Sequence, residues 1–407
     1  MKIAMLTSGG DCQGLNSALR GVAKSLYCRF GNDVELYGVR DGYRGLIEDD
    51  IRKMNRNDFS GILTLGGTIL GTSRQPFKSM CLPAEEYGGK TRLEKMLETC
   101  KKYKFDCLVV LGGNGTHKTA NLLSQNGINI VSLPKTIDND LWGTDHCPGY
   151  GSAAKFVATS CMEIYHDARV YDTGMICIIE IMGRHAGWLT AASSLATAMG
   201  CGPDLIYLPE RVFDMDAFKA DVKRVFEKSG KCIVAVSEGV HDASGKLIAE
   251  YGADNAPVDA FGHKQLGGLA ATLAHILQDT VNTKIRPIEL SLLQRCAAHC
   301  ASATDVQEAF QAGKAAVECA VSGITDKMVG FARETDDQGN YRCAIKLMDL
   351  TDVANTEKKV PDAWINAEGN GLLPAFQDYA LPLIQGEPER TLENGLPRFA
   401  HLKKIRA

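Results

Sequence analysis

Residues 107–116 read Cys-Leu-Val-Val-Leu-Gly-Gly-Asn-Gly-Thr, an apolar run that ends in a glycine-rich turn. The run has the length and composition of a short buried strand. The first apolar run, Lys2–Thr7, ends in the same way, at Gly9 and Gly10. Strands that close at glycine and alternate with helices are typical of a parallel sheet covered by helices on both faces. The pattern therefore predicts an α/β fold.

Five further apolar runs and five helical patterns repeat this alternation along the chain. The predicted strands are Lys2–Thr7, Val34–Val39, Cys107–Leu111, Asn129–Leu133, Met175–Ile181, Leu205–Leu208 and Cys232–Val236. The predicted helices include Leu15–Phe30, Gly151–Ala168, Met215–Lys228, Gln265–Gln278 and Val306–Val321. A chain of 407 residues is about twice the usual length of one domain. We therefore expect two Rossmann-like three-layer lobes with mostly parallel sheets.

Composition and charge exclude several classes of protein. Hydrophobic residues make up 45% and charged residues 23% of the chain, as in ordinary globular proteins. The net charge is −4 without a basic block, so we expect no nucleic-acid partner. No apolar run approaches the roughly 18–20 residues of a membrane span, and the N-terminus lacks signal-peptide features. The 14 cysteines contain no C-x-x-C pair. We expect a cytoplasmic enzyme with free thiols.

The two glycine turns could bind an anion. Backbone N–H groups between a strand and a helix approach phosphate closely where glycine removes the side chains. Ser8–Gly10 and Gly112–Thr116 both have this form, and parallel strands would bring them to one crevice. Neither turn is a Walker A loop, and either alone could be an ordinary tight turn.

A third segment, Lys135–Asp140, carries two carboxylates after another predicted strand. Strand alternation would point Thr136, Asp138 and Asp140 in one direction. Near a polyphosphate, one carboxylate could accept the proton of an attacking hydroxyl and the other could hold Mg²⁺. Lys135 and Arg74 could neutralise the transferring charge. Alone, two such aspartates are as often turn formers.

These segments together resemble the phosphofructokinase family, which phosphorylates the 1-hydroxyl of fructose 6-phosphate. The resemblance covers roughly residues 1–330 and is most specific at Thr136–Asp140 and Met182–Arg184. It implies an active site in a cleft between a donor-binding lobe, 1–149 plus about 295–347, and a sugar-phosphate-binding lobe, 150–294. A C-terminal extension, about 348–407, would then pack on the lobes or at an oligomer interface. The family also implies a homodimer or homotetramer.

The resemblance assigns roles to residues at matching positions. Asp138 would be the base, and the other catalytic groups would be Lys135, Thr136 and Arg184. Asp140 and Asn114 would hold Mg²⁺. The expected donor-binding residues are Gly10, Tyr43, Arg74, Gly113, Asn114, Gly115 and Thr116. The expected substrate-binding residues are Thr136, Asp138, Met182, Gly183, Arg184, Glu238, Arg286 and Arg295.

The expected pocket for the 6-phosphate departs from the family pattern. Gly262–Gly268 imitates a family string but lacks its arginine, so we align Gln294-Arg295 instead. Leu292 then occupies the position of a phosphate-contacting histidine, and Met175 that of an arginine donated across a subunit interface. Lys284 or His299 could compensate. Fructose 6-phosphate remains the favoured acceptor, since Arg286 and Arg295 can hold a dianion, and sedoheptulose 7-phosphate is the second.

The phosphoryl donor is ATP or pyrophosphate. Gly115 is the residue of ATP users, because pyrophosphate users typically carry an aspartate there that repels the α-phosphate. Lys135 is usual in pyrophosphate enzymes, and Thr119 also favours pyrophosphate as the donor. ATP is our main expectation and the reversible pyrophosphate-dependent reaction is the alternative. A non-catalytic regulatory subunit is remote because both aspartates are present. Arg20 and Lys24 do not distinguish an effector site from a solvated helix face, and we predict no effector.

Overall fold

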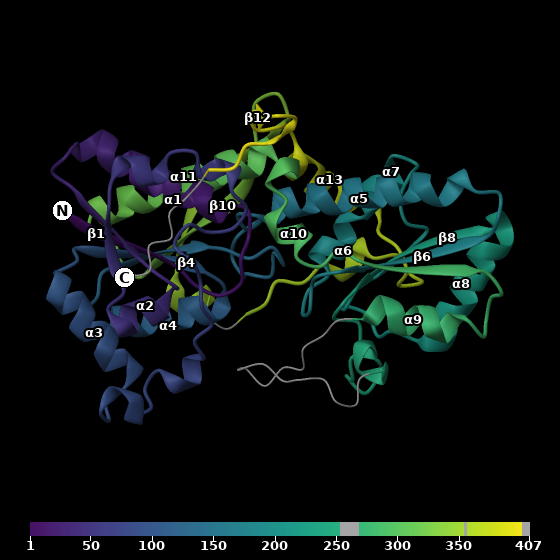
Figure 1. The fold of residues 1–407 in the computed structure, drawn as a ribbon, viewed down its shortest axis with the longest axis horizontal. Helices are drawn as coiled ribbons and strands as arrows, with labels where there is room; N and C mark the ends of the chain where they lie inside the picture. Colours follow the sequence, from purple (N-terminus) through teal and green to yellow (C-terminus); the bar gives the residue numbers. More distant parts are fainter. Residues whose placement is uncertain (253–267, 354–355, 401–407) are drawn as a thin grey trace.

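The computed structural model describes residues 1–252, 268–353 and 356–400 and contains two sheets, each covered by helices (Figure 1). The expected fold class, α/β with two three-layer lobes and mostly parallel strands, is confirmed. Figure 1 shows the two sheets side by side along the longest axis of the molecule. The N-terminus lies in the lobe that the first sheet forms.

The first sheet has seven strands in the order β11-β10-β5-β4-β1-β2-β3. Its five central strands run parallel, and β3 and β11 pair antiparallel at the two edges. The strands are β1 (Lys2–Thr7), β2 (Glu35–Val39), β3 (Ile51–Met54), β4 (Cys107–Gly112), β5 (Ile130–Pro134), β10 (Lys327–Thr335) and β11 (Tyr341–Asp349). The strands β4 and β5 are buried along their whole length, and β1 is buried at all but its first residue, which explains their continuous apolar runs.

Helices cover both faces of this sheet. In Figure 1, α1 (Leu15–Phe30) and α11 (Ala303–Val321) lie above it, and α2 (Tyr43–Glu48), α3 (Arg92–Tyr103) and α4 (Asn114–Gln125) lie below. The helices α1 and α11 approach closely because a Cβ at Gly21 would meet the backbone of α11 and one at Gly313 the backbone of α1. Helix α11, which comes late in the sequence, therefore packs in the same lobe as the N-terminal residues.

The second sheet has four parallel strands in the order β7-β8-β6-β9. They are β6 (Met175–Ile181), β7 (Leu205–Tyr207), β8 (Lys231–Ser237) and β9 (Lys284–Glu289). The surrounding helices are α5 (Tyr150–Val170), α6 (Trp188–Ala192), α7 (Ser194–Ala198), α8 (Met215–Ser229), α9 (Leu269–Leu277) and α10 (Leu293–Cys296). Figure 1 shows α5 on one face of this sheet and α8 and α9 on the other.

The described part of the C-terminal region packs on both lobes. It contains α12 (Leu350–Val353), two 3₁₀ turns, Asp362–Trp364 and Leu381–Ile384, α13 (Pro374–Ala380), and the short pair β12 (Leu392–Glu393) and β13 (Leu396–Pro397). Trp364, Phe376 and Tyr379 stack around Trp188 of the second lobe, with ring centroids 5.1–6.3 Å apart. Aromatic packing of this kind fixes the segment to the lobe.

All seven predicted strands agree with the structure to within one residue at each end. The strands β3, β9, β10 and β11 and the short pair β12 and β13 were not predicted. The predicted helix Gln265–Gln278 begins outside the described residues, and its described part is α9. All 14 cysteines are free.

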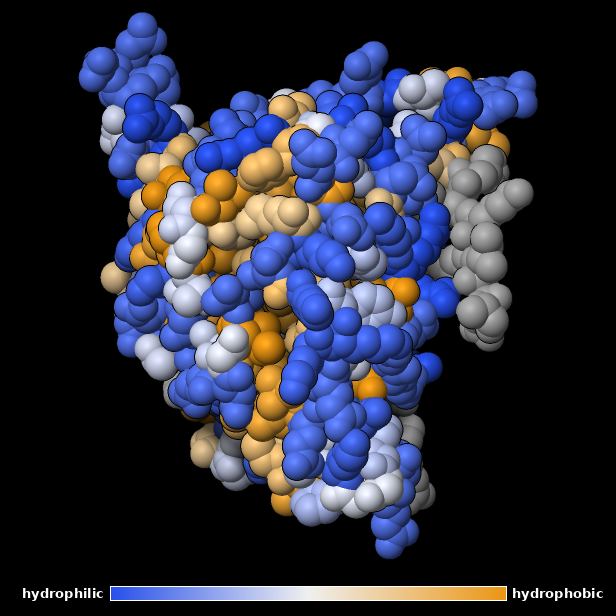
Figure 2. Space-filling model, turned by 90° about the vertical axis from the view of Figure 1, so that its left-hand side faces the viewer, coloured by the Kyte–Doolittle hydropathy of each residue, from blue (hydrophilic) through white to orange (hydrophobic). Residues whose placement is uncertain are grey.

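Seen from the end of the seven-stranded lobe, the surface is mainly hydrophilic, with apolar residues gathered in a band (Figure 2). Within the described ranges, no helix has the length and apolar character that crossing a membrane requires.

Candidate active site

A cavity of about 1060 Å³ lies between the two lobes, at the carboxyl ends of strands from both sheets. Ligands of open α/β sheets bind at this edge. The cavity brings together most of the predicted site residues: Gly10, Tyr43, Arg74, Gly113, Asn114, Gly115, Thr116, Lys135, Thr136, Asp138, Asp140, Met182, Arg184, Glu238 and Arg295. Of the remaining two, Gly183 contacts the cavity-lining Glu238, and Arg286 lies elsewhere.

The turn after β1 is held from two sides. The Thr72 hydroxyl donates to the Gly9 carbonyl oxygen at 2.6 Å, and the ammonium of Lys135 donates to the carbonyl oxygen of Gly10. Lys135 is buried, and burial lowers its pKa, while the nearby Cys12 and Asp11 act in the opposite direction. The ammonium group of Lys135 is thus enclosed between the turn after β1 and the chain after β5.

The second glycine turn opens helix α4. Gly113 is the residue before the helix, and Asn114, Gly115 and Thr116 form its first turn at the cavity wall. The N–H groups of a first helical turn lack partners within the helix and favour anions. The Tyr43 hydroxyl donates to the Thr116 carbonyl oxygen at 2.8 Å, so Tyr43 supports the turn.

Gly115 is exposed at the cavity, and a Cβ built on it would meet no heavy atom within 4 Å. The side-chain oxygen of Asn114, by contrast, is buried and accepts no hydrogen bond from the described residues. The turn therefore presents open space at one position and an unused carbonyl oxygen at the preceding one.

The segment Thr136–Asp140 is a turn rather than the extended strand that we expected, because β5 ends at Pro134. Asn139 has φ of 55°, and the Asp138 N–H donates to the Thr136 hydroxyl at 3.1 Å. The turn nevertheless brings Thr136, Asp138 and Asp140 to the same cavity. We call residues 136–140 the aspartate turn.

Both aspartates of this turn hold protons more tightly than free carboxyl groups do. Burial, followed by the charges of Asp140 and Glu238, raises the pKa of Asp138 to about 7. Burial, followed by the charge of Glu357, raises the pKa of Asp140. A carboxylate with a pKa near neutrality is suited to accept a proton during a reaction.

The second lobe contributes the ends of β6 and β8. Met182, Gly183 and Arg184 follow β6, and Glu238 follows β8. The Gly183 N–H donates to the Glu238 carboxylate at 3.3 Å, and the Met182 N–H donates to the Gln294 side chain at 3.2 Å. Burial raises the pKa of Glu238. These contacts place the two strand ends side by side, facing the aspartate turn.

The residues expected around the 6-phosphate are not gathered in one place. Arg295 lines the cavity, whereas Arg286 lies exposed on the edge strand β9 and does not. Leu292 is exposed, and Met175 is buried at the start of β6. Lys284 and His299, the expected substitutes, are exposed and do not line the cavity either. The rejected string Gly262–Gly268 lies outside the described residues except for Gly268.

Several cavity residues were not predicted. Phe77, Lys78 and Lys118 also line the cavity. Lys118 stands four residues after Asn114 on the same helix, so helical spacing could have found it. Glu357 comes from the C-terminal region, and no sequence motif connects it to this cavity.

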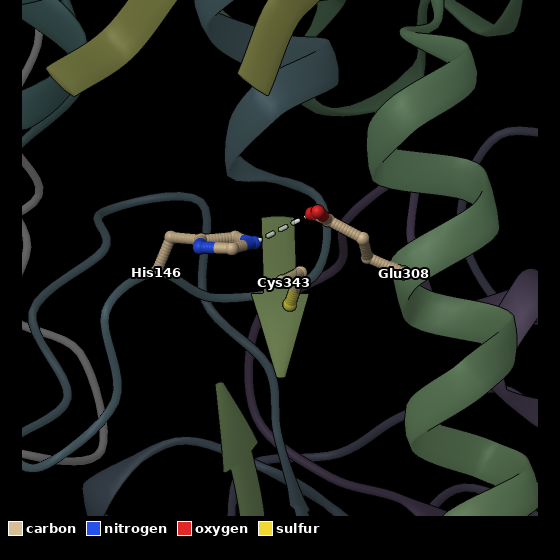
Figure 3. A group of neighbouring side chains, drawn as sticks. All are labelled: His146, Glu308 and Cys343. Atoms are coloured by element: carbon tan, nitrogen blue, oxygen red, sulfur yellow. Dashed lines mark hydrogen bonds and ion pairs between the residues drawn. The ribbon is translucent and has the colours of Figure 1, made fainter. Parts of the chain in front are cut away.

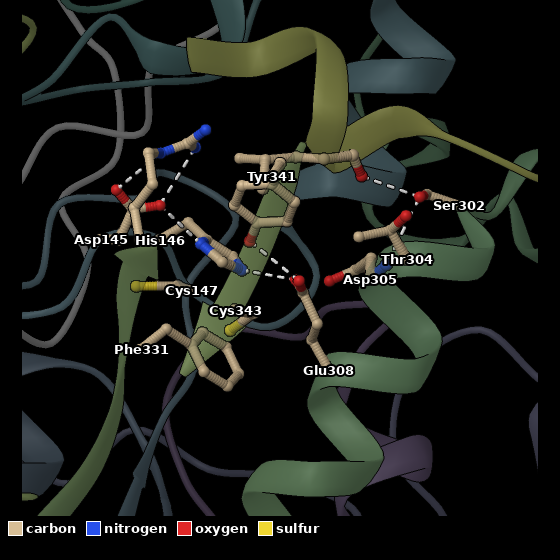
Figure 4. A network of polar contacts seen from close by, with 12 residues as sticks. Asp145, His146, Cys147, Ser302, Thr304, Asp305, Glu308, Phe331, Tyr341 and Cys343 are labelled. Atoms are coloured by element: carbon tan, nitrogen blue, oxygen red, sulfur yellow. Dashed lines mark hydrogen bonds and ion pairs between the residues drawn. The ribbon is translucent and has the colours of Figure 1, made fainter. Parts of the chain in front are cut away.

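A second polar cluster lies behind the aspartate turn, where His146, Glu308 and Cys343 come within 4.8 Å of one another (Figure 3). His146 contacts Asp145 at 2.9 Å through Nδ1 and Glu308 at 2.7 Å through Nε2. Tyr341 also donates to Glu308, and Arg333 contacts Asp145 (Figure 4).

Both ring nitrogens of His146 are thus occupied by carboxylates. Burial alone would lower the pKa of His146, but the hydrogen bonds to Asp145 and Glu308 raise it. A protonated imidazole has no lone pair for a metal ion. The cluster is best described as an ion-paired support.

The fold and this cavity define a two-lobed α/β protein with paired carboxylates and anion-binding turns. The chain belongs to the phosphofructokinase family, whose model, described as Phosphofructokinase, matches residues 2–320.

Curated relatives carry two kinds of name. The "Pyrophosphate--fructose 6-phosphate 1-phosphotransferase" of Xanthomonas campestris is 36% identical over 98% of this chain and 95% of its own length. The "ATP-dependent 6-phosphofructokinase" of Spirochaeta thermophila is 41% identical over 80% of this chain and 86% of its own. Among solved structures, the pyrophosphate-dependent phosphofructokinase of Marinobacter aquaeolei has a TM-score of 0.83 at 30% identity, covering 100% of this chain and 97% of its own.

Proposed function

We propose that the protein transfers a phosphoryl group from ATP to the 1-hydroxyl of fructose 6-phosphate, giving fructose 1,6-bisphosphate, a step of glycolysis. Family membership and the names of the relatives support the acceptor. The observation that carries the choice of donor is the open space at Gly115.

Asp138 accepts the proton of the sugar hydroxyl. Its raised pKa, about 7, makes it a stronger base than an ordinary carboxylate while leaving a large ionised fraction near neutral pH. Thr136 supports the turn, because its hydroxyl accepts a hydrogen bond from the Asp138 N–H. Arg184 and Lys135 approach from opposite sides of the cavity and balance the charge of the transferring group.

The donor set fits Mg²⁺. Asp140 supplies a carboxylate and Asn114 supplies a buried side-chain oxygen that accepts no hydrogen bond from the described residues. Hard oxygen ligands of this kind are the ones Mg²⁺ prefers, and one or two protein ligands are enough beside a polyphosphate. When bound, the ion neutralises phosphate charge.

The sugar phosphate binds on the side of the second lobe. Met182, Gly183 and Glu238 bracket the sugar hydroxyls, and Arg295 contacts the phosphate. Arg286, which lies exposed on β9 and does not line the cavity, remains a proposed second phosphate contact.

On the donor side, Gly10, Arg74, Gly113 and Thr116 surround the phosphates, and Tyr43 supports their turn. The cavity is also lined by Phe77, Lys78 and Lys118. An aromatic ring and two cations suit a nucleoside with an α-phosphate. A pyrophosphate would leave this part of the cavity unused.

Pyrophosphate is the second candidate donor, and Lys135 favours it. A buried ammonium beside the turn strengthens binding of a short, highly charged donor. The relatives that align over 98% of this chain also carry pyrophosphate-dependent names.

We further propose the lobe boundaries given above, with the seven-stranded lobe binding the donor and the four-stranded lobe the sugar. A homodimer or homotetramer in the cytoplasm is also proposed, with sedoheptulose 7-phosphate as a second acceptor.

A matched donor assay tests the proposal. Purified protein with Mg²⁺ and fructose 6-phosphate receives ATP in one reaction and pyrophosphate in the other, and fructose 1,6-bisphosphate is measured through aldolase. Turnover with ATP alone supports the proposal. Turnover with pyrophosphate alone would show that pyrophosphate, and not ATP, is the donor. The absence of turnover with either donor would refute both candidate functions.

A further inference from the structure

Lys358, from the C-terminal region, lies directly under the aspartate turn. Its ammonium donates to the carbonyl oxygens of Asp145 and Thr144 at 2.6 and 3.2 Å and to the side-chain oxygen of Asn139 at 3.3 Å. Its backbone N–H donates to the carbonyl oxygen of Asp140 at 2.7 Å. One residue thus contacts both the turn and the chain that leaves it.

Tyr379, from α13, holds the same turn from another side. Its hydroxyl accepts a hydrogen bond from the Asn139 side-chain amide at 2.8 Å and donates to the Asp145 carbonyl oxygen at 2.7 Å. The other amide atom of Asn139 accepts from the Cys147 N–H at 3.0 Å as well as from Lys358. Both ends of the Asn139 amide are therefore fixed.

Asn139 is the residue between Asp138 and Asp140, and it is fully buried. Its backbone has φ of 55°, a left-handed conformation that non-glycine residues adopt at a cost. Asparagine adopts this conformation more readily than other such residues, so neighbouring contacts determine how firmly it is held. The contacts that do so through the Asn139 side chain come from Lys358, Tyr379 and the Cys147 N–H.

The C-terminal segment that carries Lys358 is also fixed to the second lobe. The Trp188 indole donates to the Lys358 carbonyl oxygen at 2.9 Å, and the Lys358 ammonium lies 4.9 Å from the centre of the Trp188 ring. The Val360 N–H donates to Glu210, which also accepts from the Gly187 N–H. Lys358 therefore joins the aspartate turn of one lobe to the strand-end loops of the other.

We propose that Lys358 and Tyr379 are positioning residues, which hold Asp138 and Asp140 in their reactive geometry by fixing Asn139. This inference rests on the proposed roles of the two aspartates. It assigns a catalytic contribution to a segment that lies beyond residue 320, where the family model ends.

The physical consequence concerns the reaction step more than binding. Displacing a reacting group by about 1 Å costs on the order of 100-fold in rate. The sugar and donor contacts at Glu238, Arg295 and Gly113 do not involve Lys358 or Tyr379. Loosening the turn should therefore lower kcat and leave KM for fructose 6-phosphate nearly unchanged.

Three variants test this. Lys358→Met removes the ammonium and keeps most of the apolar stem, and Tyr379→Phe removes one hydroxyl and keeps the ring beside Trp188. Lys359→Met is the matched control, because Lys359 is exposed. We expect kcat to fall by about 10- to 100-fold in the first two variants, KM to stay within about 3-fold, and the control to behave as wild type.

A wild-type kcat in both Lys358→Met and Tyr379→Phe would overturn the inference, and so would a loss confined to KM. If Lys358→Met does not fold, Tyr379→Phe alone decides. Asp138→Asn, assayed beside them, separates this inference from the proposed function. If Asp138→Asn is active, the proposed role of Asp138 as the base is refuted. If Asp138→Asn is inactive while Lys358→Met and Tyr379→Phe are fully active, only the proposal that Lys358 and Tyr379 are positioning residues is refuted.

Discussion

The ammonium of Lys135 donates a hydrogen bond to the carbonyl oxygen of Gly10, joining the chain after β5 to the turn after β1. Both residues line the cavity between the lobes. Since Lys135 is buried and close to Asp11, its positive charge is directed at the donor turn rather than at solvent. The same contact gives the chain after β5 and the turn after β1 a fixed relative position.

Lys135→Met should therefore lower kcat/KM with either donor, by on the order of 100-fold, because a preorganised charge next to the phosphates is lost. Steady-state kinetics with the active donor will measure this. Lys101→Met, on the exposed surface of α3, is the control. Unchanged kinetics in Lys135→Met would show that this lysine acts only in folding.

Asp138→Asn should lower kcat by about 1000-fold, because the amide cannot accept the hydroxyl proton. Its thermal stability in metal-free buffer at pH 8 should not fall. The pKa of Asp138 is raised in the folded protein, so at this pH the native state holds an unfavourable charge that the amide removes. Turnover assays and thermal melts measure the two effects, and retained turnover would exclude Asp138 as the base.

Gly115→Asp should shift donor preference from ATP towards pyrophosphate by at least about 10-fold. The carboxylate would enter the open space beside the turn and repel an α-phosphate. Gly115→Ala fills part of the same space without charge and separates the steric effect from the electrostatic one. An unaltered ratio of the two kcat/KM values in Gly115→Asp would contradict this account.

His146→Gln should destabilise the protein by about 2 kcal/mol at pH 6, because hydrogen bonds to two carboxylates are weakened. The pKa of His146 is raised on folding, so its contribution is complete below about 6.5, the pKa expected for unfolded histidine, and is lost as the pH rises through the folded value. The difference in Tm between variant and wild type should thus narrow between pH 6 and pH 9. A gap that widens with pH would mean that His146 is buried in its neutral form.

Phe376→Ala should cost about 3–5 kcal/mol in the free energy of unfolding, since Phe376 is fully buried in α13. Urea unfolding measures this loss. Leu381→Ala, at a position that is 52% exposed, is the control and should cost little. A loss below about 1 kcal/mol at Phe376 would show that the C-terminal region is only loosely attached to the second lobe.

The parallel strands that we predicted could be recognised because they are buried on both faces. Lys2–Thr7 and Met175–Ile181 match the structure at both ends, since their apolar runs stop where the chain leaves the core. In contrast, β9 is an edge strand with the polar sequence Lys-Ile-Arg-Pro-Ile-Glu, and β11 is exposed at most positions. Neither edge strand has the continuous apolar run by which we identified the others.

The cavity was predictable where motifs follow strands and unpredictable where it depends on distant packing. Glycine turns and the aspartate turn stand at strand ends, and parallel topology brings such ends together. Glu357 reaches the cavity, and Lys358 and Tyr379 reach the aspartate turn, only because the C-terminal region docks on Trp188. Nothing local in that sequence encodes the contact. Arg286, placed by resemblance, lies at a sheet edge instead, so its role stays a prediction.

The order of strands in the seven-stranded sheet also governs how the protein is made. The edge of β5 is covered by β10, and about 190 residues separate the two strands along the chain. At ribosomal speeds, on the order of 10 to 40 s pass between their synthesis. During this interval β5 exposes unpaired backbone groups that can bind the wrong strand. We therefore expect this edge of the nascent sheet to need protection from wrong pairing until β10 has been made.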